Sequence, residues 1–210
     1  MALQNLDFKR SWEGKEPFLV RLSDLFCEMD RAYEKVAEQA GFLCRGCGDN
    51  CCETRFHHHT LLEVFFLFEG FLNLPKESRE KIQSLAGTRC REMESHDAKN
   101  MDIPFRGLCP LSDGTLCLLY HSRPMVCRLH GVFWKMQGRG GEIQGPGCDL
   151  FEKALKEKKS GADAGFLLDR TDFYRRFSLL EQEFRSFSRF DGKIKMTIAE
   201  IFSLEEIKEF

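Results

Sequence analysis

The stretch "CRGCGDNCC", residues 44–52, crowds four thiols into a segment that separates two apolar helical patterns. Gly46, Gly48 and the pair Asp49-Asn50 within it favour turns. Two residues between the first two cysteines are the usual first half of a tetrahedral metal site, because both sulfurs can then turn toward one ion. The stretch therefore predicts a metal-binding loop between helices.

Apolar residues recur at steps of three and four on both sides of this loop, which is typical of helices. Residues 17–40 are predicted to form an amphipathic helix that Gly41 ends. Residues 60–94 are predicted to form a largely buried helix and then a charged one, separated at Pro75. Residues 166–189 carry a narrow apolar stripe, which we interpret as packing on the core rather than as a dimer seam. The stripe consists of Phe173, Phe177, Leu180, Phe184 and Phe187.

The composition indicates one globular domain over residues 1–210. With 42% hydrophobic residues and 20 Phe, the chain can bury a core without help from disulfides. Its net charge of −2 gives no general case for nucleic acid or an acidic membrane surface, and no apolar run reaches the roughly 18 residues of a membrane span. The first residues lack the apolar core of a secretory signal, so we expect a cytoplasmic protein without nucleic-acid or membrane partners.

The ten cysteines are too sparse for a small disulfide scaffold, where Cys exceeds roughly 8–10% of residues. Clustered cysteines in a chain of this size more often bind metal or react. Consecutive Cα atoms lie about 3.8 Å apart, short of the roughly 4.4–6.8 Å of a disulfide, so Cys51 and Cys52 should not bond each other. We expect Cys27 to be a buried residue of the first helix and Cys90 to be incidental. Eight candidate metal ligands remain: Cys44, Cys47, Cys51, Cys52, Cys109, Cys117, Cys127 and Cys148.

The segment "LCPLSDGTLCLLY", residues 108–120, has the pattern of a β-hairpin around Asp113-Gly114. A two-residue loop would put Cys109 and Cys117 on opposite faces. A three-residue loop with Gly114 in the left-handed conformation would pair the two cysteines directly. We favour the second register, because it brings both sulfurs within reach of one metal.

The segment "HSRPMVCRLHG", residues 121–131, predicts a short helix, since Pro124 suits its first turn and Gly131 its C-terminal cap. On that helix Cys127 and His130 would share a face, which makes His130 a further candidate ligand.

Three further features bear on the site. Cys148 precedes another predicted helix, "DLFEKALKEKK". The run His57 to His59 is expected at the surface, although one of the three could replace a thiolate. Residues 121–139 are basic and contain no acid, so they could either offset the charge of metal-bound thiolates or form a solvated face. The basic residues are Arg123, Arg128, Lys135 and Arg139.

The expected fold is mainly α, with helices packed around a small irregular cysteine-rich region that contains a short β-hairpin. The cysteine-cluster core covers residues 44–148, the N-terminal helix about 17–40, and the C-terminal helical part about 150–210.

The segments "CRGCGDNCC" and "CPLSDGTLCLLYHSRPMVCRLHG" together resemble the YkgJ-type cysteine-cluster (CxxCxxCC) family of zinc- or iron-chelating domains. The family pattern has two residues before the Cys-Cys pair, whereas this chain has Gly48-Asp49-Asn50. The resemblance implies chelation of metal through the eight cysteines. A relative, the flagellin lysine N-methylase, implies that some members use an iron–sulfur cluster in methyl transfer.

The leading hypothesis is a protein that chelates iron, either as ions or as an iron–sulfur cluster, or zinc. We lean to iron because eight thiols exceed what one zinc needs. The alternative is an iron–sulfur-dependent enzyme such as a protein lysine N-methylase-like methyltransferase, and a third hypothesis is an interaction module shaped by zinc. No GxGxxG or P-loop pattern marks a nucleotide-derived cosubstrate, and no catalytic residue is assigned.

Overall fold

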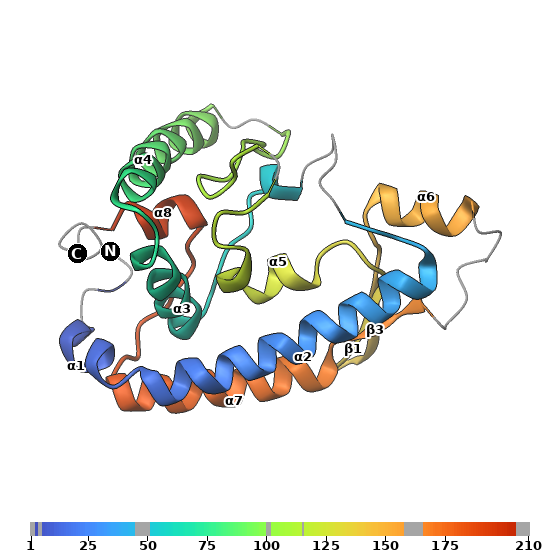
Figure 1. The fold of residues 1–210 in the computed structure, drawn as a ribbon, viewed down its shortest axis with the longest axis horizontal. Helices are drawn as coiled ribbons and strands as arrows, with labels where there is room; N and C mark the ends of the chain where they lie inside the picture. The colour runs from blue at the N-terminus through green and yellow to red at the C-terminus, as the bar shows by residue number, and fades with distance from the viewer. Residues whose placement is uncertain are drawn as a thin grey trace. The chain divides into compact units, whose positions relative to one another are not determined.

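The computed structural model of the protein describes residues 3, 6–44, 51–99, 102–114, 116–157 and 166–204. This part of the chain is mainly helical and contains a small three-stranded sheet (Figure 1), which confirms the predicted fold class. Contacts divide the chain into two compact units. The first comprises Met1–Lys15, Arg45–Pro124 and Arg185–Phe210, and the second comprises Glu16–Cys44 and Met125–Phe184. The single domain over residues 1–210 stays a prediction.

The first unit is built around α3, whose sequence is apolar on almost every side. Phe71 of α3 packs against Phe202 of α8 with ring centroids 4.9 Å apart, and Phe68 packs edge-on against Trp12 of α1 at 5.1 Å. The predicted break at Pro75 is confirmed, because it separates α3 from the charged helix α4. The helices of this unit are α1 (Phe8–Glu13), α3 (Leu61–Leu72), α4 (Lys76–Ala98) and α8 (Ile198–Phe202), with 3-10 turns η1 (Cys51–Glu53) and η2 (Tyr120–Ser122).

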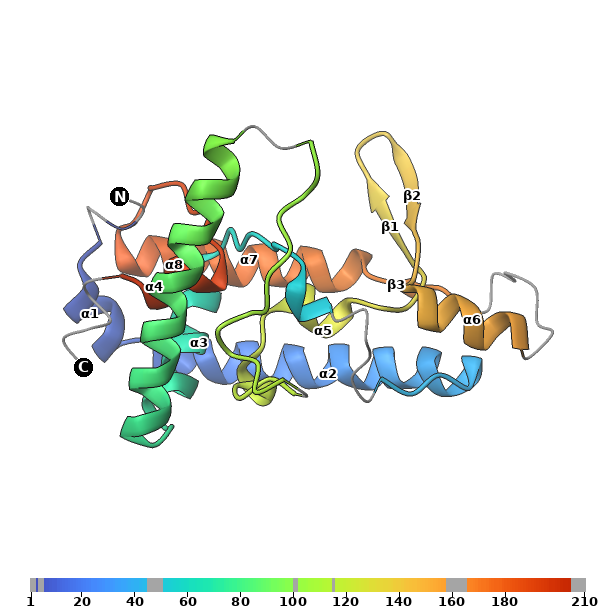
Figure 2. The ribbon, with the colours of Figure 1, turned by 90° about the horizontal axis from the view of Figure 1, so that it is seen from above.

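In the second unit two long helices, α2 (Glu16–Ala40) and α7 (Thr171–Ser188), run side by side in opposite directions (Figures 1 and 2). The last four residues of α7 lie beyond Phe184, where this unit ends. Phe18 packs on Phe184 at 5.2 Å, and Phe26 packs on Phe177 at 6.2 Å. The apolar stripe of α7 therefore packs on the core, as the spacing predicts. Two shorter helices complete the unit, α5 (Met125–Leu129) and α6 (Asp149–Glu157).

The sheet has the strand order β2-β1-β3. β1 (Trp134–Gly138) and β2 (Gly141–Gly145) form an antiparallel hairpin that projects from the second unit (Figure 2), and β3 (Leu168–Asp169) pairs with β1 in parallel. The hairpin lies in a stretch that the sequence marks only as rich in turns. Among the helices described, none combines the length and the apolar character needed to cross a membrane.

The end of α2 is defined by a Schellman motif. Gly41 has φ of 69°, and its N–H donates to the Glu38 carbonyl at 2.9 Å. The N–H of Phe42 donates to the Ala37 carbonyl at 2.8 Å, which satisfies a second carbonyl of the last turn. The motif turns the chain out of the helix toward Cys44.

We expect Gly41→Ala to lower the free energy of unfolding by about 1–2 kcal/mol, because an L-residue with a Cβ is strained in the left-handed region. Nothing lies within 4 Å of the added Cβ, so backbone strain is the only cost. Gly140→Ala is the matched control, since Gly140 also has open space but no positive φ. Urea unfolding measures both, and equal stability of the two variants would contradict this account.

Candidate metal centre

The eight predicted ligands are divided between the two units. Cys52, Cys109 and Cys117 belong to the first unit, and Cys44, Cys127 and Cys148 to the second. Cys47 lies outside the described residues, and of Cys51 only the backbone, in η1, is described. None of the described cysteines forms a disulfide.

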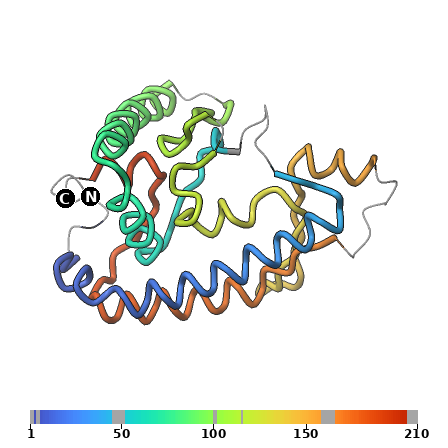
Figure 3. Tube along the Cα trace, in the orientation of Figure 1, coloured from blue at the N-terminus to red at the C-terminus, as the bar shows by residue number. Residues whose placement is uncertain are grey.

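In the first unit, backbone hydrogen bonds join the two cysteine-bearing motifs. The Cys109 N–H donates to the Cys52 carbonyl at 2.8 Å. Next to it, the Gly107 N–H donates to the Glu53 carbonyl at 3.1 Å, and the chain beyond forms an antiparallel bridge. Figure 3 shows these two segments, far apart in the sequence, lying side by side. The pairing holds Cys52 and Cys109 on adjacent segments, which neither motif predicts by itself.

The predicted hairpin register is wrong, although Gly114 has the predicted positive φ, 100°. Cys117 bridges to Ser112 and not to Cys109. The reason is that Cys109 begins a turn of its own, in which the Ser112 N–H donates to the Cys109 carbonyl at 2.9 Å and Pro110 supplies the fixed φ. A second turn follows at once, because the Asp113 carboxylate accepts the Leu116 N–H at 2.8 Å.

In the second unit, a backbone hydrogen bond links the segments that carry Cys127 and Cys148. The Cys148 N–H donates to the Gly131 carbonyl at 2.8 Å. Gly131 has φ of 113°, and a Cβ there would lie 3.8 Å from the Cys148 Sγ and 3.0 Å from the Tyr33 hydroxyl oxygen. Cys148 also supplies the carbonyl that accepts the first hydrogen bond of α6, from Glu152 at 3.0 Å, so the predicted helix after Cys148 is confirmed.

Cys44 is tied to the same region through aromatic packing. Phe42, two residues before it, packs edge-on against Phe151 of α6 at 5.4 Å, and Phe133 packs against the other side of Phe151 at 5.3 Å. Phe151 is fully buried. The anchor fixes the chain just before Cys44, while the Cys44 side chain itself is exposed.

The basic stretch is not a uniformly solvated face. Arg128 is 4% exposed, lies over the Phe26 ring at 4.3 Å and forms an ion pair with Asp30. Lys135 forms an ion pair with Glu142 at 3.4 Å. The remaining two members differ, since Arg123 stacks over the Tyr120 ring at 3.7 Å and Arg139 is exposed.

The two cysteines outside the predicted set behave differently from each other. The prediction that Cys27 is buried is wrong, because its side chain is exposed on α2. Cys90 is half-buried on α4, with its Sγ 3.5 Å from the Ser203 Oγ. Burial raises the pKa of the Cys90 thiol and so disfavours the thiolate that binds metal.

The histidine run is not wholly at the surface, so that expectation is wrong for His58, which is 2% exposed. Its backbone pairs with Met196 through hydrogen bonds of 2.7 and 3.0 Å, which turns the ring inward. Burial, followed by the charges of the neighbouring histidines, lowers the pKa of His58 to about 4, and its Nε2 has no hydrogen-bond partner among the described residues. His57 is half-buried, His59 is exposed, and His130 follows the last residue of α5.

The donors fit a thiophilic metal. The described cysteines form no disulfide, and two backbone hydrogen bonds join their segments in pairs, Cys52 with Cys109 and the segment of Cys127 with Cys148. Thiolates are the ligands that zinc and iron–sulfur centres take. Within the described residues alone, which omit Cys47 and the Cys51 side chain, no three His, Cys, Asp or Glu side chains stand close enough to hold one ion.

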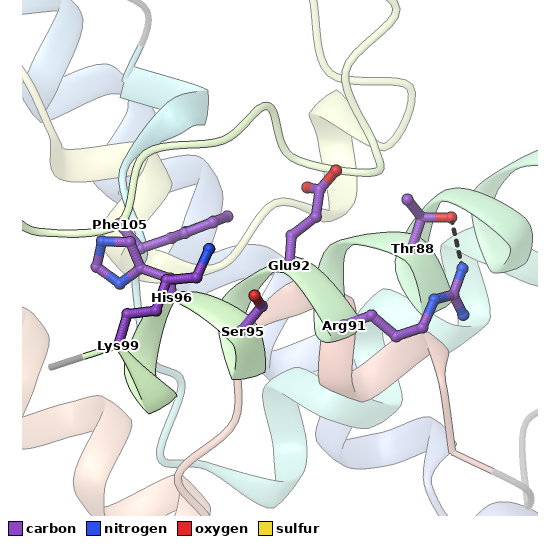
Figure 4. Close-up of a pocket in the computed structure, with 7 residues that line it drawn as sticks. All are labelled: Thr88, Arg91, Glu92, Ser95, His96, Lys99 and Phe105. Carbon is purple, nitrogen blue, oxygen red and sulfur yellow. Dashed lines mark hydrogen bonds between the residues drawn. The ribbon is translucent and has the colours of Figure 1, made fainter. Parts of the chain in front are cut away.

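A pocket of about 480 Å³ lies along α4 (Figure 4). Arg91 turns toward Thr88 and donates to its hydroxyl at 3.1 Å, and the His96 ring packs edge-on against Phe105 at 5.4 Å. No predicted cysteine ligand is among the described residues that line it. They are Thr88, Arg91, Glu92, Ser95, His96, Lys99 and Phe105.

Cysteines on paired segments, none of those described in a disulfide, are suited to a metal-chelating cysteine cluster. The family model CxxCxxCC, described as "putative zinc- or iron-chelating domain", matches residues 43–149, and the chain belongs to this family. The match confirms the resemblance seen in the two motifs. No curated protein and no solved structure matches the chain.

We expect metal-free protein to lose stability as the pH falls from about 6.5 toward 4, partly through His58. Over that range the unfolded chain takes up a proton at His58 that the folded protein, with its pKa of about 4, does not. The full loss from this one group is about 3 kcal/mol. His58→Phe should flatten this part of the pH dependence, measured by urea unfolding at pH 7 and pH 4.5.

The control is His121→Gln, which alters an exposed histidine that is not among the neighbours lowering the pKa of His58, and it should keep the contribution of His58 to the pH dependence. Identical slopes for wild type and His58→Phe would show that the burial of this ring does not govern the acid response.

Proposed function

We propose that the protein chelates iron or zinc through eight cysteine thiolates and that iron is the preferred metal. The proposed ligands are Cys44, Cys47, Cys51, Cys52, Cys109, Cys117, Cys127 and Cys148. Chelation of zinc or iron is the property of the family to which the chain belongs.

The observation that carries this proposal is the hydrogen bond from Cys109 to Cys52. It supports a shared site because it ties together the two motifs that hold most of the proposed ligands. The second motif alone supplies three thiols, Cys109, Cys117 and Cys127, too few for a closed site of four. The pairing reduces the chain entropy that metal binding would otherwise have to overcome.

The number of thiols supports iron over a single zinc. Four thiolates complete a structural zinc site, and four also hold an iron–sulfur cluster. Eight thiolates would serve two zinc ions, or one iron centre with thiolates to spare. Because none of the described cysteines forms a disulfide, we propose a reducing compartment, the cytoplasm.

Cys52→Ser and Cys109→Ser should each lower the metal content of protein purified anaerobically, because a neutral hydroxyl is a poor substitute for a thiolate ligand. Metal analysis gives the stoichiometry. The absorption spectrum distinguishes iron–sulfur, which gives a brown protein, from zinc, which gives a colourless one.

The matched control is Cys27→Ser, since Cys27 is exposed on a regular helix and should leave metal content unchanged. The ligand assignment is refuted if Cys52→Ser and Cys109→Ser retain full metal while Cys27→Ser loses it.

A further inference from the structure

Arg170 is a buried cation that hydrogen-bonds to the Tyr174 side chain and has no carboxylate partner among the described residues. It lies between β3 and α7 and is 8% exposed. Its Nη2 donates to the Leu129 carbonyl at the end of α5, its guanidinium lies 4.6 Å from the centre of the Trp134 ring, and its Nε has no hydrogen-bond partner among the described residues. No carboxylate in the described part of the chain pairs with it. Burial lowers the pKa of Arg170, yet an arginine stays charged in proteins.

Arg128, the other buried arginine described in this unit, has its charge balanced by a carboxylate. Arg128 is as deeply buried as Arg170, and the carboxylate of Asp30 balances its charge. A buried charge without a counter-charge is costly. Arg170 therefore leaves one positive charge in the interior of the second unit that the described carboxylates do not balance.

The contacts of Arg170 link it to the segments that carry two proposed metal ligands. Leu129, whose carbonyl Arg170 binds, lies between Cys127 and Gly131 in a segment of five residues. The Cys148 N–H donates to the carbonyl of that same Gly131. A Cβ at Gly131 would lie 3.0 Å from the Tyr33 hydroxyl oxygen, and Tyr33, like Tyr174, interacts electrostatically with Arg170.

We propose that Arg170 is a positioning residue whose charge offsets the thiolates of Cys127 and Cys148 when these bind metal. This inference rests on the proposed function. Four thiolates around a divalent ion leave a net charge of about −2. A fixed guanidinium in a poorly hydrated interior stabilises that charge more than a surface arginine would, and salt screens it less.

The test is the affinity of metal-free protein for Zn²⁺, measured by competition with a chromophoric chelator. Arg170→Gln keeps hydrogen-bonding groups and removes the charge, and we expect it to bind Zn²⁺ on the order of tenfold more weakly. The deficit should persist when the salt concentration is raised. Arg170→Lys restores a cation and should recover most of the affinity.

Arg21→Gln is the control, because Arg21 is an exposed arginine of the same unit that pairs with Glu183, and its loss should leave the affinity unchanged. If Arg170 had a purely structural role, its replacement would lower the stability of the metal-free protein without changing the Zn²⁺ affinity of the folded form. Wild-type affinity in Arg170→Gln, or an equal loss in Arg170→Lys, would therefore overturn the inference.

Arg170→Met provides a second neutral variant if Arg170→Gln does not fold, because apolar residues often replace buried charges without loss of stability. If neither variant folds, Arg170 serves the fold itself and the inference is abandoned. The proposed function itself is refuted if the wild-type protein takes up neither Zn²⁺ nor anaerobically supplied Fe²⁺. That result differs from the one that refutes only the inference, in which the wild type binds metal and Arg170→Gln binds it equally well.

Discussion

The hydrogen bond from the Cys109 amide to the Cys52 carbonyl is the constraint on which the first unit's site depends. It closes a loop that contains both α3 and α4, so those helices must pack before or together with the pairing. Closing a loop of this length costs chain entropy that grows only slowly with loop length. The buried aromatic contacts between α3 and its neighbours contribute the free energy that makes the closure favourable. The apolar core of this unit thus brings the two cysteines to adjacent segments.

In the second unit, helix ends and aromatic packing hold the cysteine-bearing segments in place. Cys44 follows α2, whose end is defined at Gly41, Cys148 precedes α6, and Cys127 lies within α5. Phe151 anchors the chain near both points. Each ligand-bearing segment is therefore held by local bonds and by packing within its own unit. In both units the protein positions the segments that carry the cysteines, and none of the described cysteines forms a disulfide.

The helices could be predicted from the sequence because their periodicity, caps and breaks agree with their packing. The exposure of Cys27 could be predicted from the same pattern. Leu22, Phe26 and Met29 define the buried stripe of α2, and at about 100° per residue Cys27 points away from it. The error came from the general tendency of free cysteines to be buried, which this helical phase overrides.

The connections could not be predicted in the same way. The register after Cys109 depends on two consecutive turns, one at Pro110 closed by a backbone hydrogen bond and one at Asp113 closed by the aspartate side chain, and both compete with a regular hairpin. The burial of His58 depends on its pairing with Met196, a residue far away in the sequence. Motif spacing carries no information about such distant partners, so tertiary contacts decide these positions.

Charge places the remaining constraint on the cysteine-rich region. A cluster of thiolates is anionic even after a divalent metal binds, and bringing it out of water requires nearby positive charge. The basic stretch looks suited to that role in the sequence, but Arg128 is already paired with Asp30 and Lys135 with Glu142. Arg170 lies outside the residues that match the family model, and none of the described carboxylates pairs with its charge. The motif therefore supplies the donors, whereas a charge that would suit a bound metal comes from a part of the chain that the motif does not include.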